Sequence, residues 1–441
     1  MFETIVALAT APIKSALAVI RLSGDDCFFV VNKFFSKDLS KVTKSTIFHG
    51  FIKDDQEIID EVVLLAYKGP HSFTGEDSVE IISHGSPLIF NKIVELAVKC
   101  GARLAQGGEF SSRSYMNNKM DLIQAESIND LINAESEESK KISMMALVGK
   151  TSELIAPLKK SFGDILSLIE VNIDYPEYTD IEEANFEKIN NFCEENIKYI
   201  NKLIENGNKG RIIKDGIKVA LVGKPNVGKS SILNALLEED KAIVTDVKGT
   251  TRDVVEGKIN LNGVIVNLYD TAGIRESEDV VEEIGIKKSI NKLNEADLVL
   301  VIFDSLDLDD EDKKILEIVQ NKEHIIVYNK SDLYNKENDN NLYISALKND
   351  INPLKEEIIK RLGLSKNNYT NPSIANTREL GILENLKEQL IKIKKDNQNN
   401  LLIDIINSEI KDAYLKVLSL TGEDNDFDIA AEIFSRFCVG K

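Results

Sequence analysis

The sequence predicts a chain of three parts: an α+β N-terminal domain, followed by a helical domain into which an α/β domain is inserted. Three observations predict this order. Short strand-like runs surround one clear helix, Pro87–Cys100, near the N-terminus. Apolar residues then recur at helical spacing over 116–210 and again from Ser373 onward. Between these stretches, buried strand-like runs alternate with helices over 214–363, which is typical of a parallel sheet covered by helices.

The N-terminal part, residues 1–115, combines strands with the one helix. Its strands are expected at Thr4–Leu8, Ala16–Leu22, Glu61–Ala66 and Ser78–Ile82. The segment Met1–Ile20 has no basic start before a continuous apolar run, so we expect no signal peptide. The sequence contains no apolar stretch of about 18 residues or more, so no membrane span is expected either.

The helical part is predicted at residues 116–210 together with 370–441. Its helices are expected at Leu122–Ile132, Ile142–Val148, Leu154–Val171, Phe186–Ile204, Leu380–Ile393, Leu401–Ser419 and Ile429–Phe437. The acidic run Glu135–Glu138 is expected to form a solvated helix face.

The inserted α/β part is predicted at residues 211–369. Its limits are placed near the polar, glycine-containing stretch Glu205–Arg211 and near Lys366–Pro372. Its buried strands are expected at Val219–Val222, Val264–Tyr269, Leu298–Phe303, His324–Tyr328 and Leu342–Ile344.

Composition limits the function. The 441 residues include 54 Lys and Arg against 73 Asp and Glu, a formal net charge of −19. This charge excludes a simple electrostatic nucleic-acid binder, although a local basic patch or a basic partner could still hold RNA. The cysteines Cys27, Cys100, Cys193 and Cys438 form no CxxC pair and are too few for a disulfide framework. We therefore expect no zinc site and a reducing, cytoplasmic location.

A glycine-rich run follows the first α/β strand. Gly223-Lys-Pro-Asn-Val-Gly-Lys-Ser230 lies between a buried strand and a helix at Ser231–Leu237, which is the context that a P-loop requires. Its backbone N–H groups would face phosphates, and the helix N-terminus would favour the anion further. Lys229 should reach the β- and γ-phosphates, and Ser230 should bind Mg²⁺. The alternative is a glycine-rich turn without a ligand.

Two later segments complete a phosphate and magnesium site. Asp270-Thr-Ala-Gly273 ends a strand, where Asp270 could hold Mg²⁺ through water and Gly273 could move when the γ-phosphate leaves. Between the P-loop and this turn lies Gly249-Thr-Thr-Arg-Asp253. Thr251 is the expected Mg²⁺ ligand, with Thr250 in reserve, and a plain polar loop is the alternative.

Guanine recognition is predicted at the ends of the last two strands. In Asn329-Lys-Ser-Asp332, the Asp332 carboxylate can accept hydrogen bonds from guanine N1–H and the 2-amino group, a donor pattern that adenine lacks. Ser345-Ala-Leu347 would supply a backbone N–H to guanine O6. The complete set of expected GTP-binding residues is Asn226, Val227, Gly228, Lys229, Ser230, Ser231, Thr245, Asp246, Val247, Lys248, Gly249, Thr250, Thr251, Asp270, Thr271, Ala272, Gly273, Asn329, Lys330, Asp332, Ser345, Ala346 and Leu347.

Two residues predict an unusual route of hydrolysis. Many GTPases have a Gln after the Asp-x-x-Gly turn to orient the attacking water, but this chain has Ile274, which cannot polarise water. Asn226 lies within the P-loop, where its side-chain carbonyl could hold a monovalent cation that neutralises phosphate charge. A hydrogen bond that stabilises the loop is the alternative role for Asn226.

These motifs resemble the MnmE (TrmE) family of tRNA-modification GTPases, in the TrmE-Era-Septin-like class of P-loop GTPases. The resemblance covers the whole chain. It rests on the motifs above, on Asp270-Thr-Ala-Gly-Ile-Arg-Glu276, and above all on the terminal Phe437-Cys-Val-Gly-Lys441. The N-terminal half adds Arg21-Leu-Ser-Gly24, Glu80, His84-Gly85, Gly108-Glu-Phe-Ser111 and Asn118-Lys-Met-Asp-Leu122.

The resemblance implies an activity and partners. The family works with MnmG, which carries FAD and uses NADH, in a heterotetramer. Together they add an aminomethyl or carboxymethylaminomethyl group to C5 of the wobble uridine, U34, of certain tRNAs. The carbon comes from a tetrahydrofolate derivative, 5-formyl or methylene, bound at the N-terminal domain, which also forms the homodimer. The GTPase domains of the dimer meet across K⁺.

The resemblance also implies residue roles. The K⁺ ligands fall on Asn226, Thr245, Val247 and Thr250, and the Mg²⁺ ligands on Ser230 and Thr251. Folate contacts fall on Arg21, Glu80, Lys119 and Lys441. The catalytic set is Glu282, Lys229 and Cys438. Glu282 would orient water in place of the missing Gln, with the adjacent Glu283 as the competing assignment.

Several alternatives stay open. Cys438 could act as a nucleophile, help to orient folate, or be a buried thiol near a chain end. Arg21 and Lys119 could instead be surface salt-bridge residues. The family often has a Gly-rich loop before the strand that bears the Arg, whereas this chain has Ala11-Pro-Ile-Lys-Ser-Ala16. The competing function is a regulatory or ribosome-assembly GTPase with no part in modification chemistry.

Overall fold

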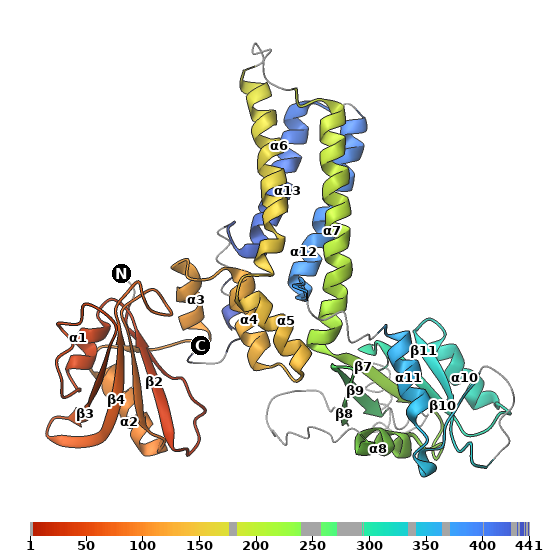
Figure 1. The fold of residues 1–441 in the computed structure, drawn as a ribbon, viewed down its shortest axis with the longest axis horizontal. Helices are drawn as coiled ribbons and strands as arrows, with labels where there is room; N and C mark the ends of the chain where they lie inside the picture. Colours follow the sequence, from red (N-terminus) through yellow and green to blue (C-terminus); the bar gives the residue numbers. More distant parts are fainter. Residues whose placement is uncertain are drawn as a thin grey trace, which may run out of the picture. The chain divides into compact units, whose positions relative to one another are not determined.

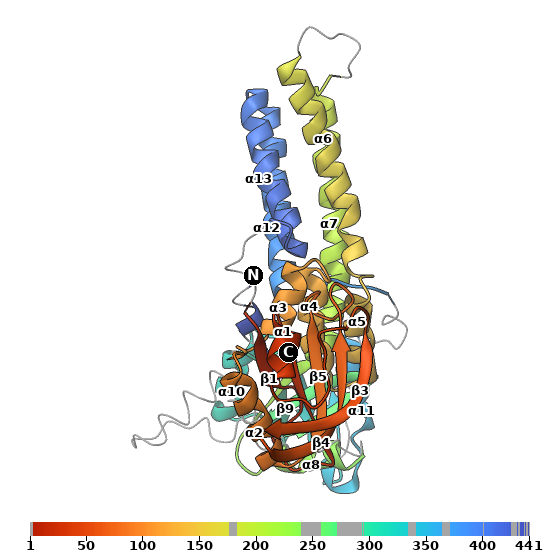
Figure 2. The ribbon, with the colours of Figure 1, turned by 90° about the vertical axis from the view of Figure 1, so that its left-hand side faces the viewer.

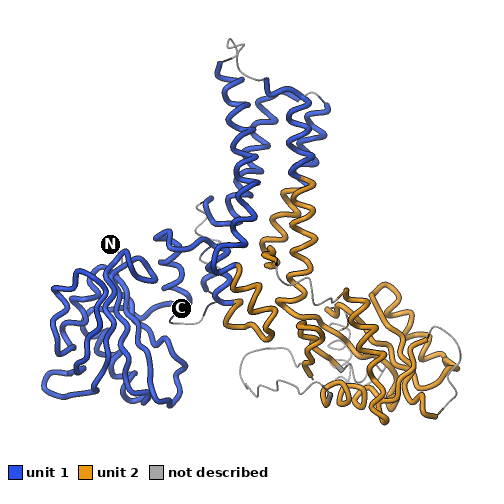
Figure 3. Tube along the Cα trace, in the orientation of Figure 1, with its two compact units in different colours: residues 1–129, 146–196, 388–441 blue, residues 130–145, 197–387 orange. Residues whose placement is uncertain are grey.

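The computed structural model describes most of the chain. The described residues are 3–175, 183–239, 257–270, 293, 295–333, 341–363, 371–399, 401–424, 430, 433–435, 437 and 440. They divide into two compact units, coloured separately in Figure 3. Unit 1 comprises residues 1–129, 146–196 and 388–441, and unit 2 comprises residues 130–145 and 197–387.

Unit 1 contains a six-stranded, mostly antiparallel sheet in the order β3-β4-β5-β2-β1-β6 (Figure 1). Its strands are β1 Ile5–Leu8, β2 Leu17–Ser23, β3 Thr46–Asp54, β4 Glu57–Tyr67, β5 Ser78–His84 and β6 Arg103–Leu104. Helices α1 (Cys27–Asn32) and α2 (Pro87–Lys99) contribute to the core that covers one face of this sheet. Alternation along β5 buries Val79 and Ile81 in that core and directs Glu80 to the other face.

Unit 1 also contains long helices that run alongside one another in Figures 1 and 2. The chain forms α3 Glu109–Met116, α4 Leu122–Ile132, η1 Ser152–Leu154, α6 Ala156–Asp174, α7 Phe186–Asp215, α12 Thr377–Gln398 and α13 Ile403–Thr421, of which α4, α7 and α12 lie partly in unit 2. Phe162 of α6 packs edge-on against Phe192 of α7, with ring centroids 4.9 Å apart, and stacks on Tyr414 of α13. These aromatic contacts join three of the helices into one bundle.

Unit 2 contains a second six-stranded sheet, in the order β12-β11-β10-β7-β9-β8. Its strands are β7 Ile217–Val222, β8 Gly257–Leu261, β9 Val264–Asp270, β10 Leu298–Phe303, β11 His324–Tyr328 and β12 Leu342–Tyr343. The described helices and turns of this unit include α5 Glu137–Leu147, which continues into unit 1, and α8 Lys229–Glu239, α10 Asp310–Val319, η2 Ala346–Lys348 and α11 Asn352–Arg361.

The five expected strands of this sheet are confirmed, and they pair in parallel. The expectation missed β8, an edge strand that pairs antiparallel with β9. Because the carboxyl ends of parallel strands lie at one edge of a sheet, the loops after β7, β10 and β11 gather at that edge.

The stretch Glu205–Arg211, near which the sequence predicted a domain boundary, is helical. It lies inside α7, which continues to Asp215. Its two glycines mark close packing: a Cβ on Gly207 would lie 2.2 Å from the Ile374 carbonyl oxygen, and one on Gly210 would lie 2.3 Å from Ser373 Oγ. The helix therefore needs glycine to let another segment approach. The domain limits themselves stay a prediction.

The acidic run Glu135–Glu138 is only partly solvated. Glu135 forms an ion pair with Lys258 of β8, at 2.5 Å between Oε1 and Nζ. The glycine of the β8–β9 turn, Gly263, approaches Glu138 so closely that a Cβ would lie 2.4 Å from its carboxyl carbon. Among the described residues, no helix has both the length and the apolar character needed to cross a membrane.

Candidate functional site

The glycine-rich loop connects β7 to α8 as expected. Asn226 and Gly228 have φ angles of +64° and +99°, so two residues of the loop adopt a left-handed backbone conformation before α8 begins at Lys229. A Cβ on Gly228 would lie 2.2 Å from Asn329 Nδ2, which explains the glycine at this position. Backbone conformations of this kind can form a concavity of N–H groups that binds an anion.

The Lys229 side chain folds back over this loop. Its ammonium donates to the carbonyl oxygens of Gly223 and Lys224, both at 2.8 Å. The side chain is largely buried, and the next residues, Ser230 and Ser231, lie exposed on the first turn of α8. The arrangement places a cation and two hydroxyl-bearing residues at the N-terminus of one helix, where an anion is favoured.

Asn329, directly after β11, connects this loop to the loop after β12. Its Nδ2 donates to the Val227 carbonyl oxygen at 2.9 Å, and its Oδ1 accepts from the Ala346 N–H at 3.2 Å. Asn329 is 3% exposed, and its hydrogen bond to Val227 is buried while that from Ala346 is partly buried. Two loops that are distant in sequence are therefore held in one arrangement by a single side chain.

The Asp332 carboxylate lies on the same edge. Ser345 Oγ donates to Asp332 Oδ1 at 2.6 Å, and this hydrogen bond lowers the pKa of Asp332. Ser345 Oγ also accepts from the Lys348 N–H at 3.4 Å, and Lys330 pairs with Asp304 at 2.6 Å. Asp332 is consequently an ionised hydrogen-bond acceptor, fixed in direction by its neighbour.

An ion-pair cluster beside the loop was missed by the sequence prediction. Lys224 Nζ lies 2.7 Å from Asp309 Oδ2 and 2.8 Å from Asp312 Oδ2. These hydrogen bonds raise the pKa of Lys224 and lower that of Asp309 to about 2. Asp309 is also the N-cap of α10, with a capping box to Asp312. The acidic residues at the start of α10 are the sequence feature that could have predicted this contact.

Many predicted site residues lie outside the described residues. These are Thr245, Asp246, Val247, Lys248, Gly249, Thr250, Thr251, Thr271, Ala272, Gly273, Glu282, Cys438 and Lys441, together with Ile274 and Glu283. Asp270 is described as the last residue of β9, without its side chain. The exposed Asn226 side chain makes no hydrogen bond recorded among the described residues, and both of its proposed roles stay predictions.

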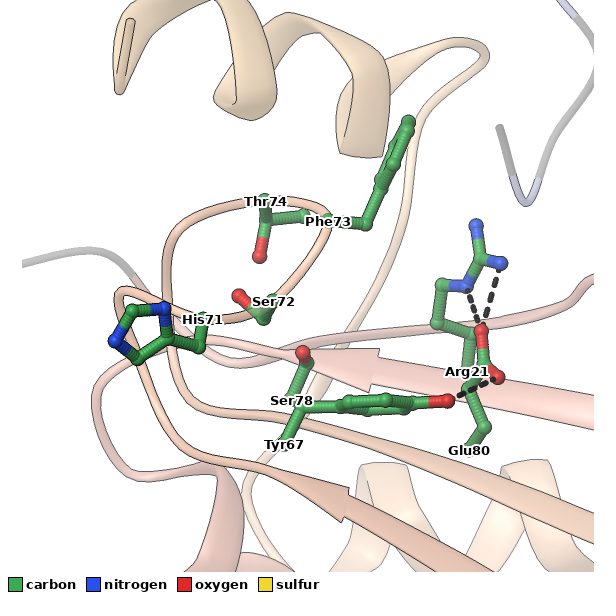
Figure 4. A pocket seen from close by; sticks show the side chains of 8 residues that line it. All are labelled: Arg21, Tyr67, His71, Ser72, Phe73, Thr74, Ser78 and Glu80. Carbon is green, nitrogen blue, oxygen red and sulfur yellow. Dashed lines mark hydrogen bonds and ion pairs between the residues drawn. The ribbon is translucent and has the colours of Figure 1, made fainter. Parts of the chain in front are cut away.

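A second site lies on the face of the unit 1 sheet that is opposite the core formed with α1 and α2. It is a cavity of about 300 Å³, shown in Figure 4. Its lining residues are Arg21, Tyr67, His71, Ser72, Phe73, Thr74, Ser78 and Glu80. We call it the Arg21 pocket. The sequence prediction had named only Arg21 and Glu80 from this set. The remaining residues come from the end of β4, the start of β5 and the loop between them.

Arg21 and Glu80 face each other across neighbouring strands. Their Cα atoms are partners in the β2–β5 register, and Arg21 Nη2 lies 2.7 Å from Glu80 Oε1. The guanidinium also lies against two aromatic rings, 5.5 Å from the centroid of Phe73 and 5.6 Å from that of Phe110. The pocket therefore combines a paired cation and anion with aromatic surface.

One further predicted residue, Lys119, lies beside the loop of this pocket. Lys119 Nζ donates to the Pro70 carbonyl oxygen at 2.9 Å, at the start of the loop that lines the pocket. Arg21 Nη1 donates to the Gly440 carbonyl oxygen at 3.4 Å. Gly440 directly precedes Lys441 and follows Cys438 by two residues, so both predicted residues are sequence neighbours of a residue that contacts Arg21.

Burial disfavours the thiolate form of the described cysteines. Burial raises the pKa of Cys27 far above its usual range and that of Cys193 to about 12, and burial also raises the pKa of Cys100. A thiol with a raised pKa stays protonated and is a poor nucleophile. None of these three therefore competes with Cys438 for a chemical role.

Comparisons with known proteins agree over the whole chain. Residues 4–119 match the family described as GTP-binding protein TrmE N-terminus, and residues 122–438 match the MnmE helical domain. The tRNA modification GTPase MnmE of Malacoplasma penetrans (strain HF-2) is 43% identical over 448 residues, covering 100% of both chains. The protein of the same name from Mycoplasmopsis pulmonis (strain UAB CTIP) is 41% identical over 446 residues, again covering 100% of both.

Solved structures are also similar over part of the chain. The structure of a single-residue variant of Aquifex aeolicus Era bound to GDP·AlF4⁻ is 28% identical and covers 40% of this chain and 67% of its own. Its TM-score is 0.28.

Proposed function

Because this chain belongs to the MnmE family of tRNA modification GTPases, we propose that its GTP hydrolysis serves modification of the wobble uridine, U34, of certain tRNAs. The proposed product is an aminomethyl or carboxymethylaminomethyl group on C5. The proposed partner is MnmG, which supplies FAD and uses NADH. The observation that carries this proposal is the 43% identity over the full length of both chains.

The nucleotide would bind at the edge of the unit 2 sheet. The loop N–H groups and Lys229 would hold the β- and γ-phosphates. Asp332 would select guanine by accepting from its N1–H and its 2-amino group. Lys229 now contacts carbonyl oxygens that phosphate oxygens would replace as partners. Ser230, on the first turn of α8, fits as an Mg²⁺ ligand because hydroxyl oxygen is a ligand that this hard cation accepts. Thr251 is proposed as the second.

The hydrolytic step is proposed to use K⁺ and a carboxylate. Asn226, Thr245, Val247 and Thr250 would provide oxygen ligands for K⁺, which supplies positive charge to the phosphates. Asn226 fits this role because its exposed side chain is presented from a left-handed turn of the loop. Glu282 is proposed to orient the attacking water, since Ile274 offers no polar group.

The Arg21 pocket is proposed as the site of the tetrahydrofolate derivative. A pterin ring has an N–H beside a 2-amino group, and the Glu80 carboxylate can accept from both. The aromatic rings of Phe73 and Phe110 flank the Arg21 guanidinium, and such surface suits a flat ring. The cavity of about 300 Å³ suits the ring end of the molecule. Lys119 and Lys441 are proposed to contact its acidic end.

Cys438 is proposed to act at the same pocket. The Gly440 carbonyl oxygen is 3.4 Å from Arg21 Nη1. Two residues of extended chain span about 7 Å, so Cys438 can reach the pocket from this anchor. Its role is either nucleophilic or in orienting folate. The alternative function, a regulatory GTPase for ribosome assembly, gives neither the Arg21 pocket nor the chain end a purpose.

The proposed assembly follows the family. The chain would form a homodimer, join MnmG in a heterotetramer, bind tRNA, and work in the cytoplasm, where tRNA substrates are. The test is deletion of the gene followed by digestion and nucleoside analysis of total tRNA. We expect loss of the C5-modified wobble uridine. Unchanged levels would remove the modification role, and association with ribosomal particles without folate binding would favour the alternative.

A further inference from the structure

Helix α3 holds the loop that lines the Arg21 pocket. We call residues Lys68–Asp77 the pocket loop. Ser114 Oγ, on α3, donates to the Phe73 carbonyl oxygen at 2.7 Å. In the turn after α3, Asn117 Nδ2 donates to the Thr74 carbonyl oxygen at 2.7 Å. Lys119 donates to the Pro70 carbonyl oxygen. One helix and the turn after it therefore hold three carbonyl groups of the loop.

A buried ion pair fixes the same helix to the strand that bears Arg21. Arg113 Nη1 lies 3.1 Å from Glu76 Oε2, and the two side chains are 5% and 4% exposed. Ser23 Oγ, on β2, donates to the same carboxylate oxygen at 2.7 Å. Separating a buried pair leaves an uncompensated charge, so α3, the pocket loop and β2 are held as one body.

The residue after Ser114, Tyr115, joins α3 to the end of α13. The Tyr115 hydroxyl donates to the Gly422 carbonyl oxygen, and the Tyr115 ring packs against Phe434 with centroids 6.0 Å apart. Gly422 is the C-cap of α13, with a φ of +78°. A Cβ there would lie 2.3 Å from the Tyr115 hydroxyl oxygen, so glycine is needed for this contact.

The end of α13 is in turn fixed to α6. Lys159 Nζ, on α6, donates to Thr421 Oγ1 at 2.7 Å and to Glu423 Oε1 at 2.6 Å. A continuous set of contacts therefore leads from α6 and α13 through Tyr115 to Ser114, and from Ser114 to the carbonyl of Phe73.

From these contacts we propose that Tyr115 is a positioning residue for the Arg21 pocket. It fixes α3 to the end of α13, and α3 sets the position of the pocket loop. A shift of the α6–α13 end then moves Phe73 relative to Arg21. The proposal concerns the geometry of the pocket, and only its ligand-based test rests on the proposed folate function.

The first test uses hydrogen–deuterium exchange of the full-length protein without ligand. Tyr115→Phe removes the hydroxyl and keeps the ring. We expect backbone amides of the pocket loop to exchange about threefold faster or more, the scale of one lost neutral hydrogen bond. Tyr414→Phe, a phenol removed from α13 itself, is the matched control and should leave these rates unchanged. Unchanged loop rates in Tyr115→Phe would overturn the proposal.

The second test measures the dissociation constant of 5-formyltetrahydrofolate. We expect Tyr115→Phe to weaken binding about threefold while the rate of GTP hydrolysis by the isolated protein stays constant. Ser114→Ala should weaken binding too, and the double variant should be no weaker than the worse single variant, because both act through α3. Additive effects would overturn the proposal. If the wild-type protein binds no folate, the proposed function fails, and the exchange experiment still decides the role of Tyr115.

Discussion

The side-chain amide of Asn329 donates a hydrogen bond to the Val227 carbonyl oxygen, with 2.9 Å between the two atoms. The same side chain accepts from the Ala346 N–H. Asn329 therefore connects the phosphate-binding loop with the loop proposed to contact guanine, and the site depends on it before any nucleotide binds.

Asn329→Ala should weaken GTP and GDP binding alike. The substitution leaves the buried Val227 carbonyl and the partly buried Ala346 N–H without their partner, which costs about 1–3 kcal/mol and corresponds to roughly fivefold to 150-fold in affinity. Fluorescent-nucleotide titration measures this. Asn385→Ala, on α12 and exposed, is the control. Equal affinity in the wild-type protein and Asn329→Ala would contradict the bridging role.

Asp332→Asn should change base selectivity. An amide in place of the carboxylate accepts from N1–H but offers an NH₂ group where the 2-amino group of guanine donates. It therefore matches the C2 carbonyl of xanthine. We expect affinity to fall for GTP and to rise for XTP, each by about tenfold or more, since a charge-assisted hydrogen bond is worth about 1.5–3 kcal/mol. A parallel loss for both nucleotides would show that Asp332 is structural.

Potassium should accelerate hydrolysis. At equal ionic strength we expect several-fold faster GTP turnover in KCl than in NaCl, because a desolvated cation at the phosphates stabilises the charge of the transition state. Asn226→Ala should remove most of the difference. Identical rates of the wild-type protein in both salts would exclude the proposed cation site.

Glu282→Ala should slow hydrolysis and leave GTP affinity intact. Loss of a residue that orients or deprotonates water costs about 10²–10⁴-fold in rate. Single-turnover hydrolysis and nucleotide titration separate the two effects. Glu283→Ala is the matched neighbour and should hydrolyse GTP at close to the wild-type rate. If Glu283→Ala slows hydrolysis and Glu282→Ala does not, the water-orienting role belongs to Glu283.

Glu80→Gln should weaken folate binding without affecting GTP hydrolysis. The substitution keeps the shape of the side chain and removes the charge that pairs with Arg21 and would accept from the pterin ring. We expect about tenfold weaker binding of 5-formyltetrahydrofolate, measured by calorimetry. Glu57→Gln, exposed at the start of β4, is the control. Unchanged affinity in Glu80→Gln would remove the pocket from the proposal.

The nucleotide-binding edge of the unit 2 sheet could be predicted because its strands and loops are encoded by local sequence patterns. Strand runs such as Leu298–Phe303 are continuous and apolar, and the glycine-rich loop and Asn329 each directly follow a run of this kind. Once strands are parallel, their ends share an edge, so separate motifs meet without knowledge of the packing. The contact of Asn329 with Val227 agrees with this inference from strand order.

The rest depended on contacts that no local pattern encodes. Gly207 and Gly210 suggested a linker, yet they allow close approach of residues 373 and 374 to α7. Glu135 belongs to an acidic run that resembles a solvated face, and its partner Lys258 is 123 residues away on a strand that the prediction missed. The pocket residues Tyr67 and Phe73 gave no signal of their own, because the strand register and α3 bring them together.

The most direct test of the central claim is reconstitution of the modification. This protein would be incubated with MnmG, a methylene or formyl tetrahydrofolate, GTP, Mg²⁺, K⁺, FAD, NADH, unmodified tRNA and an ammonium or glycine source, and the tRNA nucleosides would be identified by mass spectrometry. We expect a C5 aminomethyl or carboxymethylaminomethyl uridine at position 34 with GTP, and none with a non-hydrolysable GTP analogue. Equal yields with GTP and with the analogue, or an unmodified uridine in the complete mixture, would contradict the account.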